Sequence, residues 1–318
     1  MPEIPDIEAY IEALRSRVLG QRLLGIRVVS PFLLRTVDPP LEAVAGRRVE
    51  GIRRLAKRIV FELAACSGTP EGAAESVPVF LALHLMIAGR LHWKAPRAAV
   101  PRKGGLAALD FPDGTLLITE AGTKRRASLH IARGAEALAA LDPGGLEVVG
   151  SSPAAFEQAL RRENHTLKRA FTDPRILSGI GNAYSDEILH RARLSPFKQT
   201  QVLTEAEVVR LHGTASAVLT EWAERLRAEA RNGFPEKVTA SRPEMAVHGR
   251  FGAPCPVCGT AVRRIVYADN ECDYCPACQT EGRILADRSL SRLLRDDWPT
   301  RLDDETCPSG TDRSLDPR

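Results

Sequence analysis

The sequence has no long apolar run, so no segment of it predicts a membrane-spanning helix. Its amino end also lacks the basic stretch followed by an apolar stretch that a secretory signal requires. We therefore expect a cytoplasmic protein whose seven cysteines are reduced. Reduced cysteines in this number indicate a metal site rather than a disulfide framework.

Size and charge narrow the class of protein further. The chain has 318 residues, of which 44% are hydrophobic and 26% charged, a composition typical of a globular protein with two or more domains. The formal net charge is +4, but residues 296–318 carry a net charge of −4, so residues 1–295 carry +8. A basic body of this kind favours a nucleic-acid partner.

The first 141 residues predict an antiparallel β-sandwich. Apolar residues from Ile7 to Val18 recur at helical spacing, which indicates one helix near the amino end. Short β-rich segments follow without long helices between them, and this order favours antiparallel strands over a parallel sheet. Pro112-Asp113-Gly114 predicts a hairpin turn. The expected strands are Leu24–Val29, Val49–Arg53, Arg58–Leu63, Val79–Leu85, Leu106–Phe111, Leu116–Thr119 and Ser128–Ala132.

The pattern becomes helical after Asp142-Pro143-Gly144-Gly145, where we place a domain boundary. The long apolar stripe from Val208 to Leu226 follows a capping box at Thr204–Glu207, which predicts a long amphipathic helix. We expect a helical domain over 150–246, a cysteine-bearing domain over 247–285 and a partly disordered extension over 286–318. The extension contains a leucine pattern that predicts a short amphipathic helix.

Two Cys-x-x-Cys pairs, sixteen residues apart, form the strongest local motif: Cys255, Cys258, Cys275 and Cys278. This spacing is typical of four thiolates that bind one structural zinc ion across a β-hairpin. Cys272 gives a second interpretation, because Cys272, Cys275 and Cys278 have a spacing found in iron-sulfur proteins. The two pairs already supply four zinc ligands, so we expect Cys272 to stay outside the metal site.

The first residues offer chemistry that an ordinary terminus lacks. Removal of Met1 would leave Pro2 with a free secondary amine, and an α-amino group titrates near pH 8, which leaves a useful fraction nucleophilic at neutral pH. Glu3 beside it could donate and accept a proton. The alternative interpretation is a frayed end, since Pro-Glu occurs in any coil.

A glycine-rich turn, Ser178-Gly179-Ile180-Gly181-Asn182, precedes another predicted helix. Glycines allow a close approach of the backbone, and the amides of the helix start together with Asn182 could bind a phosphate. A turn of this kind can equally be structural. Lys168 and other basic residues nearby favour a surface that contacts a nucleic-acid backbone.

These motifs together resemble the formamidopyrimidine-DNA glycosylase and endonuclease VIII family, over residues 1 to about 285. The resemblance implies a two-lobed enzyme with a β-sandwich, a helix-two-turn-helix module and a zinc finger, which grips DNA between its lobes. It implies that Pro2 is the Schiff-base nucleophile, Glu3 the proton donor and Lys57 a catalytic residue near the damaged nucleotide. The DNA contacts that it implies are Ile87, Arg125, Arg126, Lys168, Asn182 and Asn270.

The sequence departs from the family pattern at positions that bear on the substrate. The family fills the gap left by an extruded base with methionine, arginine and phenylalanine, where this chain has Ile87, Arg125 and Ala127. Asn270 replaces an arginine that grips phosphate in the finger, and we consider Arg263 or Arg264 as a replacement. Asp6 replaces a glutamate of the opening motif.

We therefore expect a monomeric base-excision-repair enzyme that removes oxidised bases from duplex DNA and cleaves the abasic strand by elimination. Damaged or abasic DNA would be its partner and zinc its structural metal. Two alternatives remain open at this point. One is a damage-binding protein with weak or no glycosylase activity, and the other is a zinc-ribbon protein of RNA metabolism or transcription.

Overall fold

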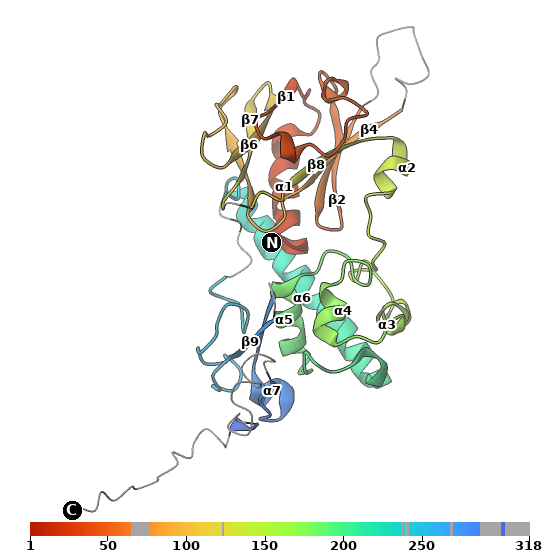
Figure 1. Cartoon of the computed structure of the whole chain (residues 1–318), viewed down its shortest axis with the longest axis vertical. Coiled ribbons are helices and arrows are strands. Elements are labelled where there is room, and N and C mark those ends of the chain that lie inside the picture. Colours follow the sequence, from red (N-terminus) through yellow and green to blue (C-terminus); the bar gives the residue numbers. More distant parts are fainter. Residues whose placement is uncertain are drawn as a thin grey trace, which may run out of the picture.

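The computed structural model describes residues 1–64, 77–122, 124–236, 238, 242–267, 270–286 and 300–302. Figure 1 shows an upper lobe of strands and a lower lobe of helices, with the amino terminus between them. The predicted helix after the cysteine domain lies mostly outside the described residues. Among the helices that are described, none combines the length and the apolar character needed to cross a membrane.

Helix α1 (Ile4–Val18) begins directly after Glu3. Its start is fixed by the backbone N–H of Glu3, which donates to Oδ2 of Asp6 at 3.0 Å, and by a proline in the first turn. The predicted apolar stripe of α1 is buried. Its residues Tyr10, Leu14 and Val18 are fully buried in the core that α1 shares with the two sheets. This packing holds the amino terminus at a fixed depth.

The upper lobe is a sandwich of two four-stranded antiparallel sheets, as the sequence predicts. Alternating apolar residues from both sheets meet in one core together with α1. The first sheet has the order β1 (Gly25–Val28), β6 (Gly105–Phe111), β7 (Gly114–Glu120), β5 (Gly89–Lys94). The second has the order β2 (Val49–Leu55), β3 (Arg58–Leu63), β4 (Val79–His84), β8 (Ser128–Arg133).

Strand β5 is absent from the sequence-based expectation, whereas the predicted turn between β6 and β7 is confirmed by the pairing of Phe111 with Gly114. Only Gly89 and Leu91 of β5 are buried. The residues between and after them are polar or aromatic and half-buried or exposed, because β5 is an edge strand. Such a strand lacks the apolar alternation that reveals its neighbours.

The lower lobe contains a second apolar core, formed by short helices around one long helix. Helix α6 has 27 residues, and its predicted capping box is present between Thr204 and Glu207. It packs against α1 through small residues, Ala9 and Ala13 on α1 and Ala230 on α6, so α6 joins the two lobes (Figure 1). The helices of this lobe are α3 (Pro153–Arg161), α4 (Leu167–Thr172), α5 (Asn182–Arg191) and α6 (Glu205–Arg231), whereas α2 (Gly134–Ala139) packs against β4 and β8 of the sandwich.

The cysteine domain is a small hairpin of β9 (Arg263–Tyr267) and β10 (Asn270–Tyr274), followed by α7 (Pro276–Thr280). Strand β10 and helix α7 contact α5 of the lower lobe. The predicted fold class, an α+β protein with an antiparallel sandwich, a helical part and a cysteine-bearing hairpin, is confirmed. The residue numbers that separate the four predicted domains stay predictions.

The buried stripe of α1 gives a test of how the amino terminus is held. Leu14 is fully buried in the core that α1 shares with the sheets, so Leu14→Ala should lower the free energy of unfolding by about 2–5 kcal/mol. Val37 is 93% exposed, and Val37→Ala should change it by less than about 0.5 kcal/mol. Urea denaturation measures both, and an equal effect of the two changes would contradict the packing described.

Candidate active site at the amino terminus

The carboxylate of Glu3 is buried and bound by the first backbone amides of α5. Its oxygens accept hydrogen bonds from Gly181 N at 2.6 Å, Ala183 N at 2.9 Å and Tyr184 N at 3.3 Å. The start of a helix carries a partial positive charge and unpaired N–H groups, so it stabilises a carboxylate at this place. The predicted glycine-rich turn therefore binds an acidic side chain of the same protein.

Lys57 approaches the same turn from the sandwich. It lies in the tight turn between β2 and β3 and is 8% exposed. A Cβ atom on Gly181 would lie 2.6 Å from Glu3 Oε1 and 2.9 Å from Lys57 Nζ, so both side chains meet over this glycine. Burial lowers the pKa of Lys57, and the charge of Glu3 opposes that shift. The structure thus brings together two of the three predicted catalytic residues.

The third, Pro2, is buried next to them, and Met1 before it is half-buried. With Met1 in place, burial lowers the pKa of the Met1 amine below its ordinary value. The carboxylates of Glu3 and Asp6 oppose this shift, and the cations of Arg90 and Lys57 reinforce it. The surroundings of the terminus therefore favour the neutral form of the Met1 amine.

Asp6, which departs from the family pattern, forms a buried ion pair with Arg242. Asp6 is fully buried, and its Oδ1 lies 3.0 Å from a guanidinium nitrogen of Arg242. Burial raises the pKa of Asp6, while the amide of Glu3 and the guanidinium of Arg242 oppose the shift. This ion pair ties the segment after α6 to the backbone of Glu3, and sequence patterns gave no sign of it because 236 positions separate the partners.

An ion pair between the lobes also holds the glycine-rich turn in place. Arg54 on β2 is bound to Glu8 of α1 and to Glu147, which lies before the helical part. Ser178, in the glycine-rich turn, donates to the carboxylate of Glu147 at 2.5 Å, and Ile4 N donates to Gly179 O at 3.2 Å. Sequence analysis missed Arg54 and Glu147, since neither belongs to a recognisable motif.

The predicted residues Ile87, Arg125 and Arg126 lie on two adjacent loops of the sandwich. Ala121 N in the second loop donates to Ala88 O in the first. Ile87 is 56% exposed, and both arginines are exposed. The buried carboxylate of Glu120 accepts the amides of Arg126 and Ala127 and thereby fixes the base of the second loop.

Ala127 itself is 3% exposed and belongs to the core of the sandwich. It therefore presents no side chain to a ligand.

The structure does not place Lys168 where DNA could contact it. Its ammonium is buried and donates to Asn182 O at 2.8 Å, Ser185 Oγ at 2.8 Å and Asp186 Oδ1 at 2.6 Å. A buried ammonium with three protein acceptors cannot also reach a phosphate, so we reassign Lys168 to the support of α5. Asn182, the first residue of α5, is partly exposed beside it.

The four predicted metal ligands lie together. The sulfur atoms of Cys255, Cys258, Cys275 and Cys278 are all within 4.8 Å of one another. The Sγ atoms of Cys258 and Cys275 are 3.4 Å apart, and those of Cys255 and Cys278 are 3.9 Å apart. Sulfurs around a tetrahedral zinc ion at 2.3 Å are separated by about 3.8 Å, so these residues fit zinc.

The iron-sulfur interpretation is not favoured, because Cys272 lies outside this group of sulfurs. It is fully buried, and burial raises the pKa of its thiol well above the usual value. Arg264 is paired with Asp273 and Glu271 rather than presented to a ligand. The side chain of Asn270 lies outside the described residues.

Comparisons with known proteins agree with this arrangement. A family model described as the formamidopyrimidine-DNA glycosylase N-terminal domain matches residues 1–126, and one described as the formamidopyrimidine-DNA glycosylase H2TH domain matches residues 148–230. The fold is similar to that of the Lactococcus lactis formamidopyrimidine-DNA glycosylase bound non-covalently to DNA with an abasic site. The TM-score is 0.73 at 22% identity, over 87% of this chain and 99% of that one.

Relatives that match over nearly their whole length carry the same name. The formamidopyrimidine-DNA glycosylase of Symbiobacterium thermophilum is 30% identical over 308 residues, 91% of this chain and 93% of the relative. That of Thermus thermophilus is 32% identical over 89% of this chain and its own full length. With two family models matched and these relatives aligned along most of the chain, the protein belongs to the formamidopyrimidine-DNA glycosylase family of base-excision-repair enzymes.

Proposed function

We propose that this protein is a bifunctional DNA glycosylase and abasic-site lyase that uses Pro2 as its nucleophile. The observation that carries the proposal is the convergence of the amino terminus, Glu3 and Lys57 on the first turn of α5. The substrate class is damaged or abasic duplex DNA, and the protein acts as a monomer in the cytoplasm. Membership of the family supports the reaction class, and the geometry of these residues supports their roles.

In the first step, the neutral amine of Pro2, freed by removal of Met1, attacks C1′ of the damaged nucleotide. The bond from C1′ to the base breaks, and the base leaves with the electron pair. The carboxylate of Glu3 takes the proton of the attacking amine and passes it to the ring oxygen as the deoxyribose opens, which leaves an iminium between Pro2 and C1′. The amides of α5 hold the Glu3 carboxylate in one direction, so the proton passes at a fixed position.

The iminium makes the C2′ protons acidic. Loss of one such proton expels the 3′ phosphate by β-elimination and breaks the strand, and water then releases Pro2 from the sugar. Lys57 contributes a second cation close to the reacting sugar, where it binds an adjacent phosphate. Glycosylase and lyase activity thus share one covalent intermediate.

The loops with Ile87, Arg125 and Arg126 face the DNA in this proposal. A base must leave the stack before C1′ can be reached, which costs a few kcal/mol of unstacking. Ile87 is an exposed apolar side chain that can fill the gap, and Arg125 offers hydrogen bonds to the orphaned base. Asn182, at the start of α5, contacts the DNA backbone.

Zinc held by Cys255, Cys258, Cys275 and Cys278 has a structural part in the proposal. Zinc bound by these cysteines would hold the two knuckles together and so fix the hairpin of β9 and β10 against α5. The first Cys-x-x-Cys knuckle lies in a turn and the second at the start of the five-residue helix α7, and such short elements have little apolar surface to hold them without a metal.

A damage-binding protein is the second candidate function. The burial of Ala127 favours it, because a chain without the aromatic wedge has fewer means of extruding a paired base. Both candidates predict binding to abasic DNA. Only the enzyme forms a covalent bond with it.

The covalent intermediate separates the two candidates. Borohydride should trap a complex between the purified protein and abasic DNA, and mass spectrometry should show Met1 absent and the adduct on Pro2. Pro2→Gly should trap less, and Glu3→Gln should lose base excision more than abasic-strand cleavage, because the sugar of an abasic site needs no leaving base. Glu12→Gln, a change elsewhere on α1, is the control. Full activity of protein that retains Met1 would end the proposal.

Gly181 gives a steric test of the same site. The backbone of Gly181 is extended (φ −136°), a conformation that alanine also adopts without strain. The added Cβ of alanine would, however, collide with the side chains of Glu3 and Lys57. Gly181→Ala should lower the single-turnover rate of base excision by about 10–100-fold. Gly213→Ala in α6 meets no atom within 4 Å and should leave the rate unchanged. Equal rates for both variants would show that the turn does not position Glu3.

A further inference from the structure

The last turn of α5 contacts the metal centre directly. His190 Nε2 lies 3.2 Å from Sγ of Cys255, and both side chains are buried, at 4% and 2% exposed. The contact joins a helix of the lower lobe to a residue of the cysteine domain, 65 positions further along the chain. None of the roles described above uses His190.

The direction of this hydrogen bond follows from the chemistry of a metal-bound cysteine. A zinc ligand is a thiolate, which has no proton to donate. The ring nitrogen at 3.2 Å must therefore carry the proton and donate it to the sulfur. Four thiolates around one divalent cation keep an excess of negative charge, and a charge-assisted hydrogen bond from a buried donor stabilises it.

The rest of the contact between α5 and the cysteine domain holds His190 in place. The carboxylate of Glu187 accepts the amides of Ala246, Val247 and His248. One turn away, Gln279 Nε2 of α7 donates to Leu194 O, just beyond the helix. His190 thus contacts the metal centre from a position fixed on both sides.

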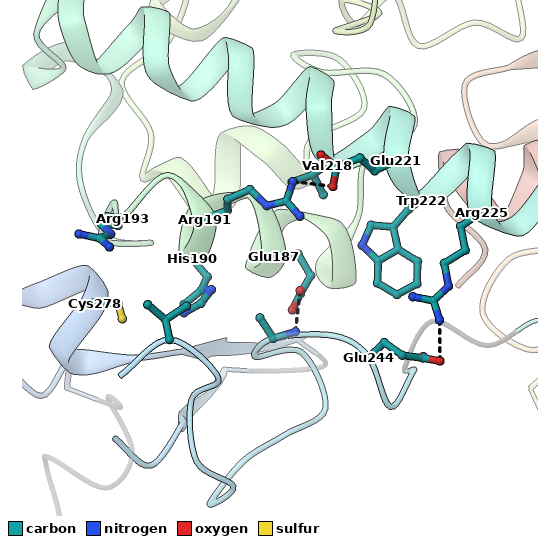
Figure 2. A pocket seen from close by; sticks show the side chains of 12 residues that line it. Glu187, His190, Arg191, Arg193, Val218, Glu221, Trp222, Arg225, Glu244 and Cys278 are labelled. Atoms are coloured by element: carbon teal, nitrogen blue, oxygen red, sulfur yellow. Dashed lines mark hydrogen bonds and ion pairs between the residues drawn. The ribbon is translucent and has the colours of Figure 1, made fainter. Parts of the chain in front are cut away.

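Figure 2 shows His190 and Cys278 on the wall of a cavity of about 510 Å³ that opens between α5, α6 and the cysteine domain. Glu187 and Trp222 line the same cavity. A small chelator can enter a space of this volume, so the edge of the metal centre is accessible to one. The rate at which zinc is lost therefore reports how firmly its thiolates are held.

We propose that His190 donates a hydrogen bond from its Nε2–H group to the Cys255 thiolate of the zinc centre. This hydrogen bond stabilises the thiolate and attaches the metal site to α5. The opposite end of the same helix binds Glu3. Seven residues, about 10 Å of helix, separate Ala183 at the carboxylate from His190 at the sulfur. The inference rests on the zinc centre proposed above.

The test measures zinc content and the rate of zinc transfer to an excess of a chelating dye, with full-length holoprotein. His190→Phe keeps a buried ring but removes the donor, and it should release zinc at least about tenfold faster than the parent. His190→Gln keeps an N–H donor and should fall between the two. His212→Phe is the matched control, because His212 packs against Phe156 in α3 and is hydrogen-bonded to Ser151, both of which lie outside the cysteine domain. It should match the parent.

The outcomes separate the inference from its basis. Parent protein purified without zinc would overturn the zinc centre itself. Zinc present in all variants but released at one rate, or released faster by His190→Phe and His212→Phe alike, would overturn the part of His190 alone.

A measurement on the unaltered protein decides the case where His190→Phe does not fold. In zinc-loaded protein with ¹⁵N-labelled histidine, the nitrogen shifts of His190 should report the Nε2–H tautomer. A proton on Nδ1 only would overturn the proposal, since Nε2 could not then donate to Cys255.

Discussion

The structure depends on one carboxylate held by the start of one helix. Glu3 is the last residue before α1, and its partners Gly181, Ala183 and Tyr184 belong to the other lobe, about 180 positions away. A buried carboxylate without hydrogen bonds would be strongly destabilising, so the sandwich and the helical lobe must meet at this point for either to be satisfied. The depth of the amino terminus and the position of Lys57 follow from that requirement.

Helix α5 meets this requirement because its own polar groups are bound. Asp186 pairs with Lys168 and His248, and it also accepts the amide of Asp273. Glu187 accepts three further amides from the segment before the cysteine domain. A short helix with four buried polar side chains would be unstable alone, whereas here the helical lobe, the segment after it and the cysteine domain contribute partners. The helix is thus a structural junction of the amino terminus, the helical lobe and the metal-binding hairpin.

The sequence predicted best what depends on neighbouring residues. The turn at Pro112-Asp113, the capping box of α6 and the two cysteine pairs are local patterns, and the structure contains all three. Strand β5 was missed because an edge strand has a polar open face. The Asp6–Arg242 and Arg54–Glu147 pairs were missed because nothing in a chain marks two charges that only folding brings together.

Lys168 shows the limit of a basic residue as evidence for DNA binding. Its neighbours in sequence, Arg169 and Arg175, suggest a charged surface, yet the periodicity of α4 turns Lys168 inward. There it balances Asp186, one of the acids of α5. The positive charge of Lys168 therefore did not distinguish an internal ion pair from a phosphate contact. The hydrogen bonds that Lys168 donates within the protein did.

The 27 residues of α6 correspond to about 40 Å of continuous helix, and its far end packs on α1 through alanines that bring the two axes close together. A rod that belongs to both lobes leaves little freedom for them to hinge apart. A ligand that contacts both lobes must then adapt to two surfaces that keep nearly the same relative position. For a DNA duplex, this means that the deformation falls on the nucleic acid, so a stretch that kinks readily would be inspected at lower energetic cost than a stiff one.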